Sequence, residues 1–210
     1  MTRRLLVSLA LLPLLLALAP TPARADEAKD ELFKAWQAFL AVKSFRADIQ
    51  MLEPMRSTTR LEFQAPDRYR VSLANGPTTV IIGDSGYMEI GGRTMKLPMA
   101  VDGIASQYRD ESFLRELQAD MTVEDLGTDS LDGEPVRKFR YVQDLAPTAA
   151  MPGAPAAASG GKTSTVAWVS ARTRLILKLD VSSGEGGKAS RTEIRYSDFN
   201  SAAIRIQPPA

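Results

Sequence analysis

The chain has 210 residues, of which 44% are hydrophobic and 24% charged, a formal net charge of +1, and neither cysteine nor histidine. Without cysteine there is no disulfide framework and no cysteine to carry a lipid anchor after a leader peptide. Without either residue, imidazole-dependent catalysis is excluded and a transition-metal site would have only carboxylates as ligands; the near-neutral charge argues against nucleic acid as a partner.

Residues 1–25 have the pattern of a secretory signal peptide. Two arginines precede a leucine-rich apolar run, and small residues stand at both positions that signal peptidase recognises. The run is shorter than the roughly 20 residues of a membrane-spanning helix and contains Pro13, so a transmembrane anchor is the weaker interpretation. We therefore expect export to the periplasm, cleavage near Ala25 and one soluble domain over residues 26–210, with a formal charge of −2 after three arginines are lost.

Residues 26–43 predict the first helix. Acidic side chains gather at its start and Lys43 lies at its end, as the helix dipole favours. Apolar residues recur at three- and four-residue steps, so one face of the helix is expected to pack against other elements. This stripe comprises Leu32, Phe33, Trp36, Phe39 and Leu40.

From residue 44 to residue 98, apolar residues stand on alternate positions, which is the period of a β-strand. Ser44–Glu53 is expected as the first strand, and up to five short runs follow between Arg60 and Pro98. Gly, Pro, Asn and Asp residues between the runs supply tight turns. We expect an antiparallel meander with one apolar and one charged face, whose apolar face must be covered.

Residues 100–119 lose the period of two. From Arg109 onward they predict a second helix, with Phe113, Leu114 and Leu117 on one side. This segment lies between two β regions and has no strand pattern of its own. It is therefore a candidate cover for the apolar face.

The remaining chain predicts further strands at 121–131, 136–142, 163–169, 174–181 and 189–196, for a sheet of about nine to eleven strands that curls. Asp132–Gly133 is a two-residue hairpin signal, and residues 182–187 are expected as a turn. Residues 146–161 are rich in Ala, Pro and Gly and are expected as a flexible, exposed loop. A partner-docking arm is the alternative for this loop.

Several short motifs suggest an enzyme, but their surroundings do not support one. Gly83–Gly86 resembles the string around a protease serine, yet no imidazole is available to take its proton. Residues 159–163 approach a Ser-x-x-Lys dyad and a phosphate loop, but Ala156 replaces the first glycine and the loop leads into a strand. The acids Asp125, Asp129, Asp132 and Glu134 are expected at a solvated hairpin end. We therefore expect no catalytic residues and no metal site.

The order of the motifs along the chain resembles the LolA/LppX-type family of periplasmic lipoprotein and lipid carriers, over nearly all of residues 26–208. After the signal and the apolar helix come Ser44-Phe45, Pro66-Asp67-Arg68-Tyr69-Arg70, Ile81-Ile82-Gly83-Asp84 with Tyr87, Tyr108-Arg109-Asp110, Asp132-Gly133, Ala167-Trp168-Val169 with Thr173-Arg174-Leu175, and Tyr196-Ser197-Asp198-Phe199.

This resemblance implies an α+β fold: a curved antiparallel half-barrel with covering helices on its concave face and a cavity for acyl chains. It implies a monomeric carrier without a cofactor, which receives lipid or lipoprotein acyl chains from an inner-membrane transporter and delivers them to an outer-membrane acceptor. Lipoprotein carriers of this family have a lid-holding arginine where this chain has Ala65. That difference leaves the lid latch and the identity of the cargo open.

We expect the cavity to be lined by apolar residues of the meander and of the second helix. A register shift of one residue would invert the face of a strand. The alternatives are a periplasmic sensor or interaction module that regulates an envelope partner, and a filled scaffold without a ligand. The expected lining residues are Ile49, Met51, Leu61, Phe63, Tyr69, Val71, Val80, Ile82, Met88, Ile90, Met95, Leu97, Phe113, Leu114 and Leu117.

Overall fold

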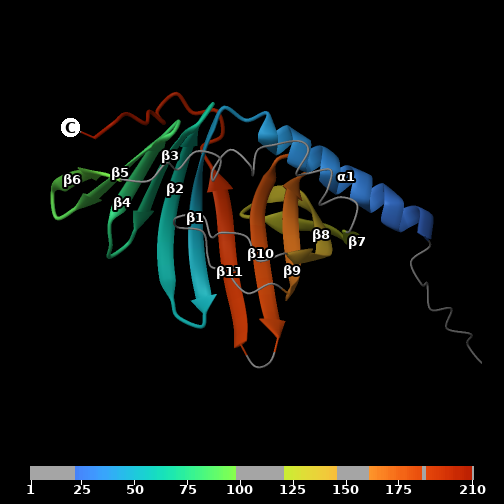
Figure 1. Cartoon of the computed structure of the whole chain (residues 1–210). Coiled ribbons are helices and arrows are strands. Elements are labelled where there is room, and N and C mark those ends of the chain that lie inside the picture. The colour runs from blue at the N-terminus through green and yellow to red at the C-terminus, as the bar shows by residue number, and fades with distance from the viewer. Residues whose placement is uncertain (1–21, 98–120, 146–160, 186–187, 210) are drawn as a thin grey trace, which may run out of the picture.

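Eleven strands pair edge to edge in one open antiparallel sheet, which is curved and carries a helix across one part of it (Figure 1). The computed structural model describes residues 22–97, 121–145, 161–185 and 188–209. The expected second helix and most of the expected signal peptide and 146–161 loop lie outside these residues. The described elements are α1 (Pro22–Leu40), β1 (Ser44–Glu53), β2 (Ser57–Gln64), β3 (Arg68–Leu73), β4 (Thr78–Ile82), β5 (Ser85–Ile90), β6 (Arg93–Lys96), β7 (Thr122–Leu131), β8 (Glu134–Leu145), β9 (Gly161–Ser170), β10 (Ile176–Glu185) and β11 (Lys188–Ser197).

The strand order is β6-β5-β4-β3-β2-β1-β11-β10-β9-β8-β7. Two meanders, β1–β6 and β7–β11, are joined by the antiparallel pairing of β1 with β11, in which Ala47 lies opposite Tyr196. β6 and β7 stand at the two ends of this order, so the sheet does not close into a barrel. The α+β half-barrel expected from the sequence is confirmed.

Most strand boundaries follow the turn signals of the sequence. Asp132 and Gly133 both have positive φ, 52° and 84°, which the mirror-image hairpin turn requires, and Leu131 pairs with Glu134 on either side of them. Two expectations are wrong. β10 begins at Ile176, because Arg174 turns the chain with φ 60°, and it continues to Glu185 instead of ending at residue 181.

The helix α1 spans Pro22–Leu40, so it begins and ends earlier than the expected range 26–43. Proline suits the first turn of a helix, where its missing N–H has no partner to lose. The buried face consists of Ala28, Leu32, Ala35 and Phe39, with Trp36 packed beside them. No helix among the described residues is long and apolar enough to cross a membrane.

The face of the sheet on which α1 packs is called the inner face, and the opposite one the outer face. α1 lies over the β7–β10 part of the sheet, where Leu32 joins a buried cluster with Phe139, Ala167 and Leu179. Along each strand, side chains alternate between the two faces. The inner face thus holds the larger hydrophobic core.

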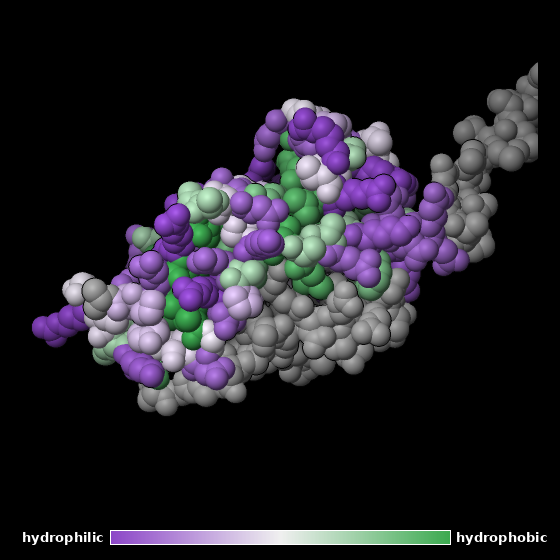
Figure 2. All heavy atoms as spheres, turned by 90° about the horizontal axis from the view of Figure 1, so that it is seen from above, coloured by the Kyte–Doolittle hydropathy of each residue, from purple (hydrophilic) through white to green (hydrophobic). Residues whose placement is uncertain are grey.

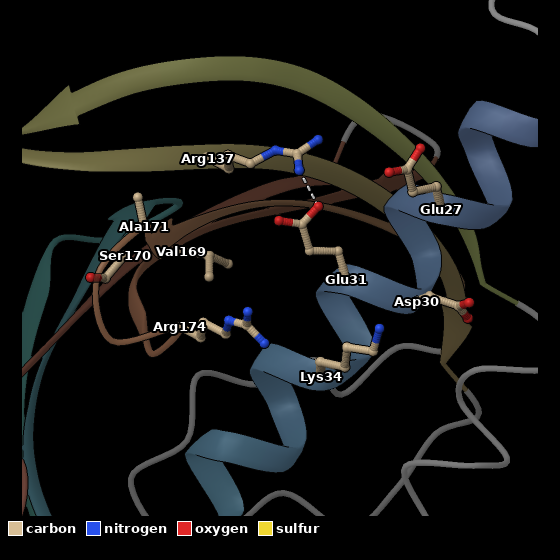
Figure 3. A pocket seen from close by; sticks show the side chains of 9 residues that line it. All are labelled: Glu27, Asp30, Glu31, Lys34, Arg137, Val169, Ser170, Ala171 and Arg174. Atoms are coloured by element: carbon tan, nitrogen blue, oxygen red, sulfur yellow. Dashed lines mark hydrogen bonds and ion pairs between the residues drawn. The ribbon is translucent and has the colours of Figure 1, made fainter.

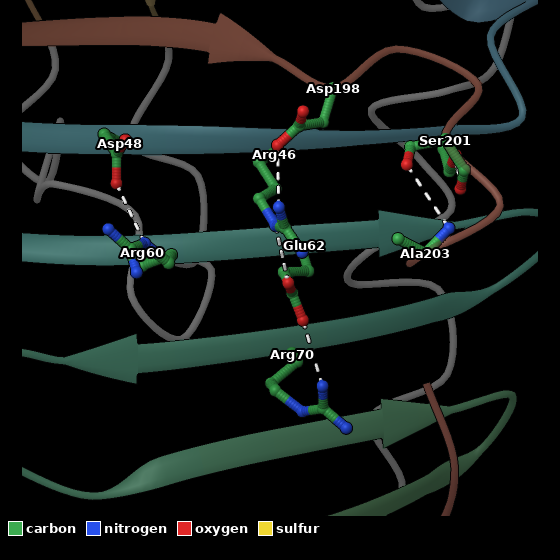
Figure 4. A network of polar contacts seen from close by, with 9 residues as sticks. Arg46, Asp48, Arg60, Glu62, Arg70, Asp198, Ser201 and Ala203 are labelled. Atoms are coloured by element: carbon green, nitrogen blue, oxygen red, sulfur yellow. Dashed lines mark hydrogen bonds and ion pairs between the residues drawn. The ribbon is translucent and has the colours of Figure 1, made fainter. Parts of the chain in front are cut away.

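The outer face carries charged side chains in cross-strand ion pairs. The Glu62 carboxylate on β2 accepts hydrogen bonds from Arg46 on β1 at 2.8 Å and from Arg70 on β3 at 2.9 Å, and Arg46 also binds Asp198 at 2.7 Å (Figure 4). A smaller apolar cluster also lies on this face, because the C-terminal segment 201–209 packs there through Ile204 and Ile206.

Candidate functional site: the inner face of the sheet

Apolar residues of the inner face lie directly opposite one another on successive strands. One row crosses the sheet from β11 to β6, with a single threonine in it. Because residues in register on neighbouring strands have Cβ atoms about 4.5–5.5 Å apart, such a row forms a continuous surface. Its members are Tyr196, Ala47, Leu61, Val71, Thr79, Met88 and Met95.

A second row is aromatic and leads outward from beneath the helix. The ring of Phe39 on α1 lies 5.0 Å from that of Phe45 on β1, which lies 5.2 Å from Phe63 on β2, which in turn lies 5.1 Å from Tyr69 on β3. These centroid distances fall within the range of favourable aromatic pairs. Ile81 on β4 lies opposite Tyr69 and extends the row.

Under α1 the inner face is also apolar, with a few polar groups among the buried side chains. Phe139, Ala167, Leu179 and Ile194 are in register from β8 to β11. Burial raises the pKa of Tyr141 well above the ordinary value of tyrosine. This tyrosine is therefore neutral at physiological pH.

The inner face is least covered at its β3–β6 end. Ile90 on β5 and Met95 on β6 are 50% and 54% exposed, and Leu73 at the end of β3 is 42% exposed, whereas Phe63 is fully buried. Hydrophobic residues are visible between hydrophilic ones when the molecule is seen from above (Figure 2). The apolar surface therefore runs from a buried interior to an accessible end.

A pocket of about 410 Å³ lies between α1 and the β8–β10 region (Figure 3). Arg137 on β8 forms ion pairs with Glu31 on α1 and with Asp125 on β7, and thus ties the helix to the sheet. Charged groups of both signs make this pocket unsuited to an acyl chain. Its lining is Glu27, Asp30, Glu31, Lys34, Arg137, Val169, Ser170, Ala171 and Arg174.

No known protein family matches the sequence, and no curated protein does. Among solved structures, the Mycobacterium tuberculosis lipoprotein LppX matches with a TM-score of 0.62 and 13% identity, over 87% of this chain and 99% of that chain. LprF from Mycobacterium bovis matches with the same TM-score and identity, over 88% of this chain and 98% of that chain. The chain has the LolA/LppX-like fold.

A third match, the LolA superfamily protein NE2245 from Nitrosomonas europaea, has a TM-score of 0.30 and 13% identity over 86% of this chain and 94% of that chain. The fold assignment rests on the matches to LppX and LprF, and at 13% identity that likeness extends to the fold and not to function.

In this LolA/LppX-like fold, most residues expected to line a cavity share the inner face, although their contact with a ligand stays a prediction. Eight of the ten inner-face residues are buried or half-buried, and Ile90 and Met95 are exposed at its accessible end. Phe113, Leu114 and Leu117 lie outside the described residues. The inner-face residues are Ile49, Met51, Leu61, Phe63, Tyr69, Val71, Met88, Ile90, Met95 and Leu97.

The expected position of Val80 and Ile82 on this face is wrong. On β4, Val80 lies opposite Arg70 and Ile82 opposite Arg68, so both side chains are on the outer face. Both belong to the cluster that Ile204 and Ile206 cover. β4 instead presents Thr79 and Ile81 to the inner face, because the segment Thr78–Ile82 has β-branched residues at every position and suits either register.

The lining residues expected from the sequence come from the first meander and the expected helix. They omit Phe45 and Ile81 of the first meander and all inner-face residues of the second. The alternation in strands 136–142, 163–169 and 174–181 is a usable signal for the second meander. The missed inner-face residues are Phe45, Ile81, Val123, Phe139, Tyr141, Ala167, Leu179, Ile194 and Tyr196.

Proposed function

We propose that this protein is a noncatalytic periplasmic carrier. It binds the acyl chains of lipids or lipoproteins on the inner face and moves them between the inner and outer membranes. The observation that best supports this proposal is the apolar row from Tyr196 on β11 to Met95 on β6, which connects a buried interior with an accessible end. Export by the signal peptide and exchange with membrane transporters and acceptors are parts of this proposal.

The energetics of such a surface suit reversible lipid binding. Each methylene moved from water into an apolar site contributes roughly 0.8 kcal/mol. Ten methylenes would thus contribute about 8 kcal/mol, which corresponds to a dissociation constant near 1 μM before the costs of ordering. Phe45, Phe63 and Tyr69 lie side by side on the inner face and are buried, so such a chain would contact them only where it displaced what covers them.

The distribution of polar groups supports a role without catalysis. Many charged side chains of the described strands pair with each other across the outer face, as in the Arg46–Glu62–Arg70 group. The acids of the β7–β8 hairpin region are also paired: Asp125 with Arg137, Asp129 with Lys138 and Glu134 with Arg172. Among the described residues, no group of three or more acidic side chains is placed to hold a metal ion.

Native mass spectrometry of protein purified from the periplasm without detergent tests this function. We expect discrete lipid adducts, which lipid extraction would identify. The protein mass should correspond to a chain that begins near Asp26. Leu61→Asn places a polar group on the inner face and is expected to reduce the adducts. Val142→Asn, at a 37% exposed position on the outer face, is the matched control and should retain them.

Circular dichroism and thermal unfolding would verify that both variants fold. A clean apo mass, with no uptake of added phospholipid or lipopeptide, would overturn the carrier. In that case a periplasmic interaction module with the same fold would be the better interpretation.

A further inference from the structure

The β5–β6 hairpin presents a surface that combines exposed apolar and cationic side chains. Ile90 and Met95 are about half exposed, and every residue of β6, from Arg93 to Lys96, is exposed. Leu73 on β3 belongs to the same surface. Its N–H donates a hydrogen bond to the carbonyl of Pro77, which directly precedes β4, and the next residue, Thr78, lies opposite Glu89 beside Ile90. We call Leu73, Ile90, Arg93, Met95 and Lys96 the hairpin patch. The first four lie on the inner face, and Lys96, opposite Tyr87, lies on the outer face of the same edge strand.

The register joins the hairpin patch to the inner face. Met95 lies opposite Met88, Met88 opposite Thr79, and Thr79 opposite Val71, which is buried. Side chains at these positions are on the same side of the sheet. An acyl chain that enters at Met95 would therefore meet apolar side chains, apart from that of Thr79, as far as Val71.

The cations of the hairpin patch differ from those on the neighbouring strands. Arg46, Arg60 and Arg70 each bind a carboxylate across the sheet. Arg93 and Lys96 form no ion pair within the described residues. Exposed apolar side chains next to unpaired cations fit a partner that has both an apolar interior and an anionic surface.

The shape of the hairpin favours a broad partner. It projects from one end of the sheet (Figure 1), and its turn is Gly91–Gly92, where an added Cβ would meet no atom within 4 Å. A surface could thus approach the turn without a clash. Apolar side chains flanked by lysine and arginine are the usual means by which proteins bind the interface of anionic bilayers.

We propose that the hairpin patch docks this protein on anionic phospholipid membranes. Ile90, Leu73 and Met95 enter the interface between headgroups and acyl chains, and Arg93 and Lys96 contact lipid phosphates. This docking does not require that the inner face carries lipid, although the row from Met95 to Val71 would connect the two.

Flotation with phosphatidylglycerol/phosphatidylcholine vesicles tests the proposal. The N-terminus is first verified by intact mass, because an uncleaved apolar leader would bind membranes by itself. We expect binding that weakens as salt rises. Arg93→Gln with Lys96→Gln should weaken the partition coefficient by about fivefold for each cation, and Ile90→Ser with Met95→Ser should weaken it at least as much.

Met55→Ser with Arg56→Gln is the control, since it makes one apolar and one cationic substitution of the same kinds at the exposed β1–β2 turn, where Met55 is 76% exposed. Its binding should equal that of the unaltered protein. No vesicle binding, or equal losses in all three double variants, would overturn the proposal and favour a protein partner for this surface. Lipid uptake from solution is measured separately, so failure of docking and failure of carriage are distinguishable.

Discussion

Two glutamines in similar strand positions differ in how their side chains are satisfied. Gln64 on β2 accepts a hydrogen bond at its Oε1 from the backbone N–H of Ile206, at 2.7 Å. Gln143 on β8 has a buried Oε1 that accepts no hydrogen bond within the described residues. A buried acceptor without a donor costs about 1–3 kcal/mol. Gln143 thus reduces the stability of the folded state.

We expect Gln143→Met to raise the free energy of unfolding by about 1 kcal/mol, because methionine has a similar length and leaves no acceptor unsatisfied. Gln64→Met should lower it by about 1–3 kcal/mol, since it leaves the Ile206 N–H without a partner. Urea unfolding of both variants measures the difference. A loss of stability in Gln143→Met would show that its oxygen has a partner in solution.

Among the elements, the C-terminal segment 201–209 determines which side chains the outer face can bury. Ile206 is fully buried and Ile204 nearly so, next to Val80 of β4. Its backbone is fixed on both sides, because Arg68 donates a hydrogen bond to the Ile206 carbonyl at 2.7 Å and Gln64 accepts one from the Ile206 N–H. The segment therefore covers the apolar cluster on the outer face of the sheet.

Ile206→Ala should lower the free energy of unfolding by about 2–5 kcal/mol, because it removes buried methyl and methylene groups and leaves a cavity. Arg205→Ala, at the exposed position beside it, should change stability by no more than about 0.5 kcal/mol. Thermal unfolding of the two variants compares these effects. Equal effects would indicate that the segment is only loosely packed on the sheet.

Elements defined by local signals could be predicted closely. The expected first strand, Ser44–Glu53, coincides with β1, and the Asp132–Gly133 turn joins β7 to β8 as expected. Both depend on residues that are neighbours in sequence. The expected face of Val80 and Ile82 is wrong because their environment depends on Ile204 and Ile206, which are more than 100 residues away. The alternation of these two isoleucines is a signal for a second apolar cluster.

At the scale of the whole molecule, the outer face is held by ion-pair groups on two parts of the sheet. Glu62 binds Arg46 and Arg70, and Glu193 binds Lys178 at 2.6 Å and also Arg195. Burial acts to raise the pKa of both carboxyls. The hydrogen bonds from their cationic partners outweigh it, so both pKa values lie below that of free glutamate.

A carboxyl with a lowered pKa in the folded state stabilises the protein above its unfolded pKa, which is about 4.3, and this contribution is lost as pH falls through the folded pKa. We expect the free energy of unfolding to fall below about pH 5. The double variant Glu62→Gln with Glu193→Gln should be less stable than the unaltered protein at pH 7, by about 1–3 kcal/mol for each site. Its free energy of unfolding should also fall less when the pH is lowered.

Urea unfolding at pH 7, 5 and 3.5 measures this dependence. Glu124→Gln is the control, because its pair with Arg140 is about half exposed and such pairs contribute little. If the double variant lost stability between pH 5 and pH 3.5 as steeply as the unaltered protein, other groups would account for the acid dependence.

The order of strands in the complete sheet could be predicted only within each meander. Successive strands such as β2 and β3 pair because a short turn joins them. The pairing of β1 with β11 joins residues about 150 positions apart, and the alternation of either strand fits many partners. The face of each strand and the extent of the inner surface depend on that long-range pairing.

That pairing also has a consequence for the newly made chain. β1 acquires one neighbour, β2, almost as soon as it is synthesised, whereas its other neighbour is the last strand of the sheet. Until β11 arrives, the second edge of β1 presents unpaired backbone N–H and C=O groups, which are a template for aggregation. A nascent or prematurely terminated chain that lacks residues 188–197 would therefore need a chaperone to protect this edge.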